Sequence, residues 1–586
     1  MSGHTEVGRP LKSEVRGGMR IEWDVPLAMD DGIVLRADVY RPEAAGEYPV
    51  IMSYGPYCKG LTFQAGWPSL WERLVREYPD AVRGTSNRYQ AWEVVDPEKW
   101  VPSGYAVVRV DSRGTGRSPG YLDALGAREA RDYYDCIEWA GEQPWSNGRV
   151  GLLGISYYAS NQWQVAAMHP PHLAAICPWE GFNDSYRDQA RHGGILSRMA
   201  HRWYEHRIRV SQHGFSSPAF RNPESGLLAT GDQGLDDDEL ASNRRDLVAE
   251  LAEHRFDDSY HIEHSGRPEE IEVPLLSAAN WGGLGLHSRG NFNGFLQAGS
   301  RQKWLEVHGG SHWGPFYTDY ARDLQQRFFD HFLKGDDNGW DREPPVLLNV
   351  RHPDDSFTPR GEHEWPLART EWRRAYLDPR AAALEFAPPA ADSERTYRAL
   401  GDGLTLLAAP FEHETEVTGP MAAKLWISST TADADLFLVV RIFGPDGNEV
   451  LFEGANDPKT PVSQGWLRAS HRRLDPERST PWQPYHPHRD AEPLTPGQVY
   501  ELDVEIWPTC LVIPAGYRLG LSVLGRDFDH GQEGVDGVLG LSMKGSGPFT
   551  HDDPADRPAE LFDGEITVYG GGQRASYLLV PVIPAP

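Results

Sequence analysis

The core of this chain is organised around residues 150–168, which read VGLLGISYYASNQWQVAAM. The apolar run from Val150 to Ile155 predicts a short buried strand, and the run from Tyr157 to Met168 predicts a helix. Ser156 lies at the turn between them. A serine at a sharp strand-to-helix turn is held outside the regular hydrogen-bonding pattern, with its hydroxyl beside the positive end of the helix. Ser156 is therefore a predicted nucleophile for acyl transfer, although Gly-x-Ser alone also fits a helix N-cap.

The segments around this turn alternate strands and helices. Helices are expected from Ala127 to Glu142 and from Asp319 to Leu333. Short apolar runs predict strands at residues 33–39, 49–53, 105–110, 173–176, 273–277 and 303–307. Such alternation predicts an α/β fold with a mostly parallel sheet covered on both faces.

Two other regions have different patterns. Between residues 182 and 265, polar helix-like stretches replace strands and predict a helical cap inserted after a core strand. Beyond a predicted linker at 335–345, apolar and acidic residues alternate, most regularly from Tyr500 to Ile506. This pattern predicts a C-terminal β-sandwich of the jelly-roll type. We expect core segments at 1–181 and 266–340, the cap at 182–265 and the β domain at 341–586.

Composition excludes several classes of partner. The net charge of −28 over 586 residues argues against nucleic acid and anionic membranes. The sequence contains no run of 18 apolar residues, so we expect no membrane span. The stretch from Met1 to Lys12 is polar, so we expect no secretory signal. The cysteines lack CxxC or zinc-site spacing, which predicts reduced thiols in a cytoplasmic protein. They are Cys58, Cys136, Cys177 and Cys510.

A nucleophilic serine needs a base, and the segment 307–313, VHGGSHW, offers two histidines after the last predicted core strand. His312 is the predicted base because the glycine-rich loop gives it reach, and the catalytic histidine of an α/β-hydrolase sheet occupies this loop. His308, nearer the strand end, is the alternative. Both also fit ordinary loop histidines.

Several stretches together resemble one family. They are 111–120 (DSRGTGRSPG), 138–139 (EW) with 143–145 (QPW), 148–151 (GRVG), 154–157 (GISY), 162–164 (QWQ) and 310–312 (GSH). The chain is similar over nearly its whole length to the cocaine esterase and X-Pro dipeptidyl-peptidase group of α/β-hydrolases (CocE/NonD acyl hydrolases, peptidase family S15). The resemblance implies an α/β-hydrolase core, a helical cap and a C-terminal jelly roll.

The resemblance also implies an oxyanion hole made by the backbone N–H of Tyr157 and the phenol of Tyr57. One departure stands out. Gly282 occupies the place where the family has its triad aspartate, and no carboxylate occurs from Val273 to Leu305.

Glu180 is the predicted replacement for that aspartate. It follows the strand after the nucleophile helix, in the stretch LAAICPWE, so it reaches the catalytic edge of the sheet from a neighbouring strand. The acid orients the imidazole and stabilises its cation, a task that depends on geometry rather than on which strand supplies it. The alternatives are that Glu180 pairs with Arg187 or Arg191, or that Asp184 or Asp188 takes the role.

Aromatic side chains near the catalytic loops fit either a substrate pocket or core packing. They are Trp163, Trp281, Trp313 and Phe316. The pairs His261 with His264 and His486 with His488 lack the spacing of a metal site, so we expect no metal and no cofactor.

We therefore expect a serine esterase that acts through an acyl-enzyme on a small or medium ester. The alternatives are an amidase, X-Pro-type peptidase or acyltransferase of the same family and, from another class, a catalytically decayed binding protein. The expected partner is a small-molecule ester or amide. The sequence leaves open the substrate's identity and whether the protein forms a homo-oligomer.

Overall fold

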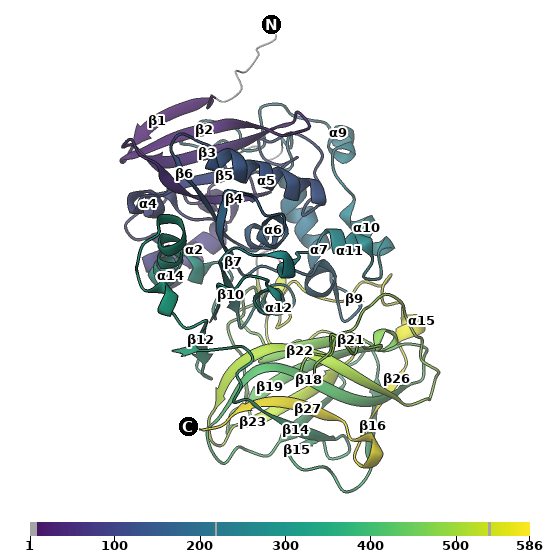
Figure 1. Ribbon diagram of the computed structural model, residues 1–586. Coiled ribbons are helices and arrows are strands. Elements are labelled where there is room, and N and C mark those ends of the chain that lie inside the picture. Colours follow the sequence, from purple (N-terminus) through teal and green to yellow (C-terminus); the bar gives the residue numbers. More distant parts are fainter. Residues whose placement is uncertain (1–8, 217–219, 537–540, 586) are drawn as a thin grey trace.

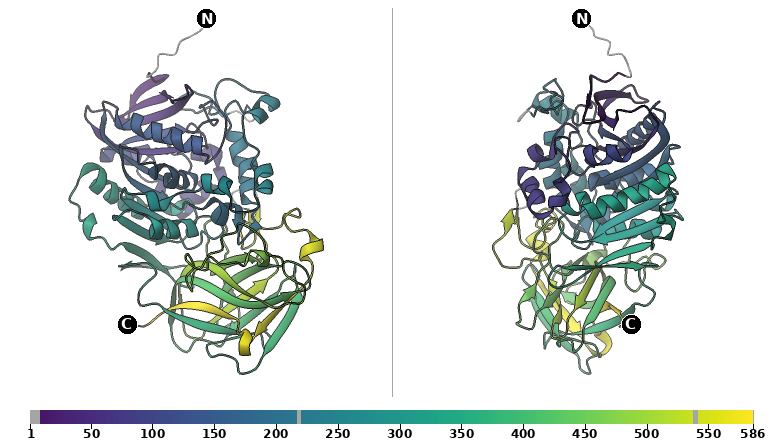
Figure 2. Two further views of the ribbon diagram at one scale, coloured as in Figure 1. Left: turned by 45° about the vertical axis from the view of Figure 1, so that its right-hand side comes forward. Right: turned by 90° about the vertical axis from the view of Figure 1, so that its left-hand side faces the viewer.

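The computed structural model describes residues 9–216, 220–536 and 541–585. Most of the N-terminal stretch in which no signal is predicted lies outside these residues. An α/β part and a β-rich part lie end to end, with β1 (Lys12–Arg16) at the far end of the α/β part (Figures 1 and 2). The chain therefore has two layered units that meet at one boundary.

Among the residues that the structure describes, the first sheet has 11 strands and continues across the α/β part. Its middle strands run parallel from β5 through β4, β6, β7, β10 and β11 to β12 (Val346–Arg351), and the edges are antiparallel. The strands near the site are β4 (Tyr48–Gly55), β5 (Ala106–Asp111), β6 (Ser146–Ile155), β7 (Leu173–Trp179), β10 (Leu275–Asn280) and β11 (Lys303–His308). Their side chains are almost continuously buried, as in a parallel sheet covered on both faces.

The helices of this part follow the sequence pattern. Helix α5 (Ala127–Gly141) buries Tyr133, Ile137 and Ala140 on one face. Helix α6 (Tyr157–Ala166) is buried at all ten positions, as expected of a helix between the sheet and other elements. Helix α14 (Asp319–Phe329) continues into a π-helical turn, Asp330–Lys334. Gly335 ends this turn with a left-handed φ of 79°.

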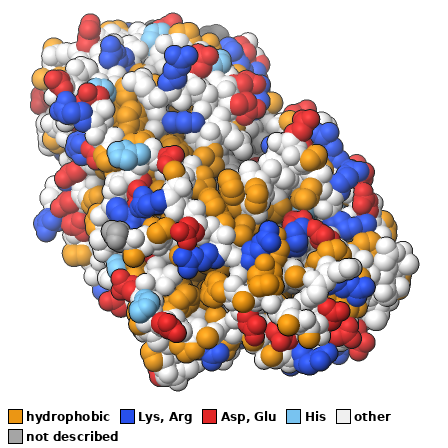
Figure 3. Space-filling model, turned by 60° about the horizontal axis from the view of Figure 1, so that its bottom comes forward, with side chains coloured by type: hydrophobic (Ala, Val, Ile, Leu, Met, Phe, Trp, Pro, Cys, Tyr) orange, Lys and Arg blue, Asp and Glu red, His pale blue; other side chains and the backbone are white. Residues whose placement is uncertain are grey.

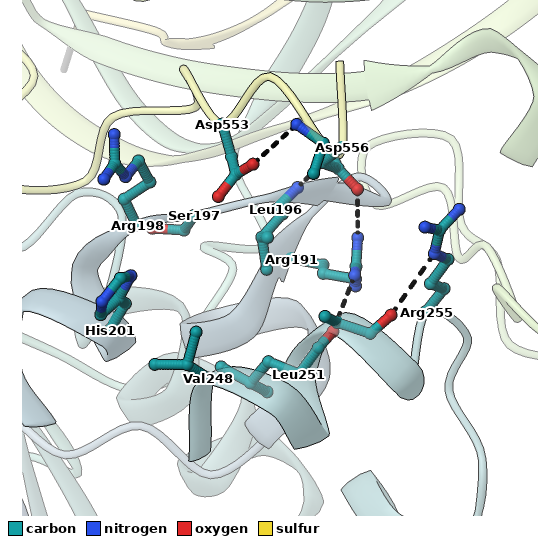
Figure 4. Close-up of a pocket in the computed structure, with 12 residues that line it drawn as sticks. Arg191, Leu196, Ser197, Arg198, His201, Val248, Leu251, Arg255, Asp553 and Asp556 are labelled. Atoms are coloured by element: carbon teal, nitrogen blue, oxygen red, sulfur yellow. Dashed lines mark hydrogen bonds and ion pairs between the residues drawn. The ribbon is translucent and has the colours of Figure 1, made fainter. Parts of the chain in front are cut away.

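Short helices fill the region predicted to form a cap. They are α7 (Met199–Trp203), α8 (Arg209–Ser211), α9 (Asp237–Ser242), α10 (Leu247–Glu253) and α11 (Ser259–Glu263). A hairpin of β8 (Arg191–His192) and β9 (Ile195–Leu196) precedes them and contacts the β-rich part. Arg191 of this hairpin joins the short helices to the β-rich part. Its guanidinium pairs with Asp556 at 2.7 Å and donates to the carbonyl of Leu251, in α10, at 2.9 Å (Figure 4).

A second sheet of 12 strands forms the β-rich part within the described residues. Its longest strands, β18 (Thr415–Ser429) and β22 (Tyr500–Ile513), pair antiparallel along most of their length. Leu502, Val504 and Ile506 are fully buried, as their alternation predicts. The predicted linker at 335–345 instead leads to another strand of the first sheet, so that sheet continues through β12 (Val346–Arg351) and β13 (Phe357–Glu362).

The surface is mixed in charge. Acidic and basic side chains are interspersed on the face shown in Figure 3. Within the described residues, no helix is both long and apolar enough to cross a membrane. All four cysteines are buried free thiols.

Candidate active site

The carboxyl ends of five neighbouring parallel strands bring the candidate residues together. Tyr57 follows β4, Ser156 follows β6, Glu180 follows β7, His287 lies beyond β10, and His312 lies beyond β11. In open α/β sheets this edge is where ligands bind. The topology therefore places residues far apart in the sequence at one site.

The turn at Ser156 has the strained geometry predicted for it. Ser156 has φ 57° and ψ −111°, and its N–H donates to the carbonyls of Trp179 and Glu180 at 3.1 Å each. Gly154 is required because a Cβ there would lie 2.4 Å from the Cβ of Tyr158. Glu180 and Glu93 also have positive φ, 49° and 63°. Such backbone strain in non-glycine residues clusters at functional sites.

Two stacked histidines lie at this turn. The Ser156 hydroxyl is 3.0 Å from Nε2 of His287, whereas His312 is held by carboxylates at both nitrogens. Its Nδ1 is 2.7 Å from Oε2 of Glu180, and its Nε2 is 3.1 Å from Oε1 of Glu93. The two rings are parallel within 3°, with centroids 4.7 Å apart. The predicted base is thus one ring away from the hydrogen-bond partner of the serine.

Glu180 is completely buried, and both of its carboxylate oxygens take part in hydrogen bonds. Besides His312, it contacts Nε2 of His308 at 3.0 Å and accepts a hydrogen bond from the Asn280 amide at 3.1 Å. His308, the alternative base, is also bonded to Glu306 at 2.7 Å. The alternative acids lie elsewhere: Arg187 pairs with Asp184 at 2.9 Å, and Arg289 pairs with Asp188 at 2.8 Å.

This arrangement fixes the charges. Burial opposes ionisation of Glu180, but His312 and His308 outweigh it and lower its pKa to about 2. Burial likewise opposes the cationic histidines, yet their carboxylate partners raise the pKa of His312 to about 10 and that of His308 to about 9. Burial and the neighbouring His312 hold the pKa of His287 well below 6.5. Burial raises the pKa of Glu93. His287 is therefore the neutral imidazole that accepts from Ser156.

Packing explains why an aspartate is absent from its usual place. A Cβ on Gly282 would lie 2.4 Å from the Cα of Gly454, which belongs to a loop of the β-rich part. Two backbone hydrogen bonds of Ala455 tie that loop to the site. Its N–H donates to the Gly282 carbonyl at 3.0 Å, and its carbonyl accepts from the His312 N–H at 2.8 Å. The β-rich part thus buttresses the histidine loop and fills the space of a side chain at position 282.

The predicted oxyanion donors also face this edge. The phenol oxygen of Tyr57 accepts a hydrogen bond from Nε1 of Trp203 at 2.8 Å, which leaves its own O–H to donate. Burial raises the pKa of Tyr57 well above 10, so the phenol stays protonated. The N–H of Tyr157 belongs to the first turn of α6, where backbone donors lack intrahelical acceptors.

A small cavity of about 40 Å³ lies beside Ser156, His287 and His312. Its other walls come from Tyr57, Trp67, Trp92, Glu93, Met199, Trp203, Arg207, Leu286, Asn456 and Pro548. The aromatic residues predicted as candidate pocket walls lie in packed interior layers instead. Trp163, Trp281, Trp313 and Phe316 are at most 2% exposed and are not among these lining residues.

The same cluster contains metal-ligand types. One donor atom each of Glu180, His287 and His312 lies within 4.8 Å of the others. Both nitrogens of His312 and one of His287 already take part in hydrogen bonds, a pattern that fits proton transfer better than ion coordination. His261 and His486 bond to backbone carbonyls.

Sequence reasoning missed His287 and Glu93. His287 lies seven residues beyond the end of β10, at the catalytic edge, in a segment whose most evident feature in the sequence is its lack of a carboxylate. Its position after a core strand was the signal that could have revealed it. Glu93 lies in a loop without a neighbouring strand or motif. It reaches the site because its carbonyl accepts from Ile155 N–H at 3.0 Å, a contact that the sequence does not encode locally.

Family models match both parts of the chain. The X-Pro dipeptidyl-peptidase (S15 family) model matches residues 31–314. The model of the X-Pro dipeptidyl-peptidase C-terminal non-catalytic domain matches residues 338–579. Together the two matches cover most of the α/β part and nearly all of the β-rich part.

Individual relatives agree with these matches. A crystal structure of a CocE/NonD family hydrolase from Staphylococcus aureus is 32% identical, with a TM-score of 0.85 over 99% of this chain and 98% of that chain. A Mycobacterium bovis protein described as a serine esterase is 27% identical over 86% of this chain and 90% of its own length. Cocaine esterase from a Rhodococcus species is 25% identical over 88% and 92%.

Proposed function

Because the chain belongs to the CocE/NonD family of hydrolases and is a serine hydrolase of ester or amide bonds, we propose that it is an esterase that acts through an acyl-enzyme at Ser156. The observation that carries this proposal is the strained turn that presents the Ser156 hydroxyl to an imidazole at 3.0 Å. A hydroxyl in this position is suited to attack on a carbonyl carbon.

We assign the general base to His312, with Glu180 as the acid that positions it. Glu180 holds Nδ1 of His312, so the ring's Nε2 is the atom that exchanges the proton. In the resting arrangement Glu93 holds that Nε2, and His287 holds the serine hydroxyl. Because His312 rests as a cation between two carboxylates, catalysis requires it first to pass its Nε2 proton to Glu93 and then to turn that nitrogen to Ser156 and take the hydroxyl proton. The direct Ser156 contact makes His287 the second candidate for the base.

The reaction follows from these positions. Ser156 Oγ attacks the ester carbonyl as its proton passes to the imidazole, while Tyr57 O–H and Tyr157 N–H stabilise the oxyanion. The imidazolium returns the proton to the leaving alcohol as the carbon–oxygen bond breaks. Water then attacks the acyl-enzyme with the same imidazole as base, and the acid product leaves.

Parallel assays test the bond preference. Purified protein is given p-nitrophenyl acetate and an Xaa-Pro anilide, with Ser156→Ala as the control. Faster hydrolysis of the ester, lost in the variant, supports the esterase. Faster release of the anilide would make the X-Pro-type peptidase the better assignment.

The rival of another class is a binding protein with a decayed triad. Against it stand a buried acid, two histidines, and donors for an oxyanion at the same sheet edge. Glu180, at the end of a neighbouring strand, takes the place of the family's aspartate. It still contacts Nδ1 of His312, and that contact is the task of the acid.

We also propose the roles of the two regions outside the core and the location of the protein. The short helices between residues 182 and 265 act as a cap, and the second sheet has a jelly-roll arrangement. Four buried free thiols support a cytoplasmic location. The boundaries 1–181, 266–340 and 341–586 remain predictions.

A further inference from the structure

A second cavity adjoins the catalytic one. It has a volume of about 310 Å³ and shares Tyr57, Trp67 and Arg207 with the cavity at Ser156. Tyr57 is the proposed oxyanion donor, so the second cavity begins next to the reacting carbonyl. A group attached to that carbonyl, or to its leaving oxygen, therefore lies beside the residues that the two cavities share.

The walls of this second cavity are mostly apolar. Besides the three shared residues, they include Leu61, Val210, Phe215, Phe220 and Ala229, with Ala65 at the rim. The hydroxyls among them are turned to the backbone. Ser211 donates to the Ile208 carbonyl at 2.9 Å, and Thr230 donates to the Phe215 carbonyl at 2.5 Å. These groups therefore add little polarity to the space.

The charged member of the lining lies at the junction of the two cavities. The guanidinium carbon of Arg207 is 5.2 Å from the centre of the Trp67 ring. Trp67 in turn stacks on Trp92, with ring centroids 4.7 Å apart. The charge is thus packed against aromatic surface near the catalytic cavity, and the residues that line only the second cavity include Leu61, Phe215 and Phe220.

We propose that this second cavity binds an apolar group of the ester, of the size of a medium alkyl chain or an aromatic ring. The inference rests on the proposed esterase function and names the substrate class. Pockets of a few hundred Å³ with apolar walls bury most of such a ligand. Each methylene moved from water into the cavity strengthens transition-state binding by roughly fourfold.

The test is a chain-length series: p-nitrophenyl acetate, butyrate and octanoate, with kcat/KM measured for each. Ala65→Trp and Ala229→Phe reduce the cavity from two sides. Ala65 is exposed on the short helix α1 (Phe63–Gly66), so its variant is the safer one for folding. Ala44→Trp, at an exposed position in the turn before β4, is the matched control.

We expect the native enzyme and the Ala44 variant to prefer octanoate over acetate. The two cavity variants should lose that preference by about tenfold or more while acetate turnover persists. A parallel series of acetate esters of ethanol, butanol and benzyl alcohol tells whether the acyl or the alcohol side occupies the cavity.

Two outcomes separate the claims. Ser156-dependent turnover of acetate without a length preference in either series, or with a preference that both cavity variants retain, overturns the cavity assignment and leaves the esterase standing. Failure to hydrolyse any ester overturns the esterase and this inference with it.

Discussion

Replacement of Glu180 by glutamine tests the least expected part of the site. The side chain is fully buried between two histidines, so the change keeps its shape and removes its charge. The pKa of Glu180 falls from 4.5 to about 2 on folding, which corresponds to roughly 3 kcal/mol of stability at neutral pH. Breaking a buried ion pair costs about 3–5 kcal/mol, a similar amount.

The loss should depend on pH in a defined direction. A carboxylate with a depressed pKa stabilises the fold above its unfolded value, and that contribution disappears as pH falls through the folded value. The difference in Tm between native protein and Glu180→Gln should therefore be greatest above pH 4.5 and shrink toward pH 2. Thermal unfolding monitored by circular dichroism across this range measures it.

The same variant should lose catalysis. Without the carboxylate, the His312 imidazolium is not stabilised, and kcat should fall on the order of 10²–10⁴-fold. Glu306→Gln is the matched control because Glu306 is equally buried but bonds His308 rather than His312. It should lose stability and retain most of its kcat. A Glu180→Gln enzyme that is folded and works within about twofold of native protein refutes the reasoning.

Four further substitutions address the other groups. Tyr57→Phe should lower kcat by about 10²-fold through loss of an oxyanion donor, seen as slower acylation in stopped flow, and an unchanged rate removes the phenol from the mechanism. Glu93→Gln should lower the pKa of His312 from about 10. Because the base must be unprotonated, the acid limb of kcat/KM should then move to lower pH, and a limb that stays in place argues against this coupling. His287→Asn should cost at most about tenfold in kcat and His312→Asn about 10³-fold. The reverse order makes His287 the base.

Much of the fold follows from local patterns. Apolar runs predict β5, β6 and β7 because both faces of these strands are covered, and alternation predicts β22 because one face is buried. The extension of the first sheet through β12 and β13 is not visible locally. It depends on pairing with β11, a tertiary contact, and the composition of 335–345 is typical of a linker.

The site was predictable where a strand end carries a motif. Ser156 and Glu180 each follow a strand directly, so the sheet topology brings them to one edge. Glu93 comes from a loop placed only by its contact with Ile155. The loss of space at Gly282 comes from the β-rich part, through Gly454, and so depends on how two distant segments pack.

The most direct measurement is labelling by a fluorophosphonate probe followed by intact-mass and peptide analysis. We expect one adduct per native chain, located on the peptide that contains Ser156, and none on Ser156→Ala. A native protein that remains unlabelled, or a Ser156→Ala protein that is still labelled, would contradict Ser156 as the nucleophile.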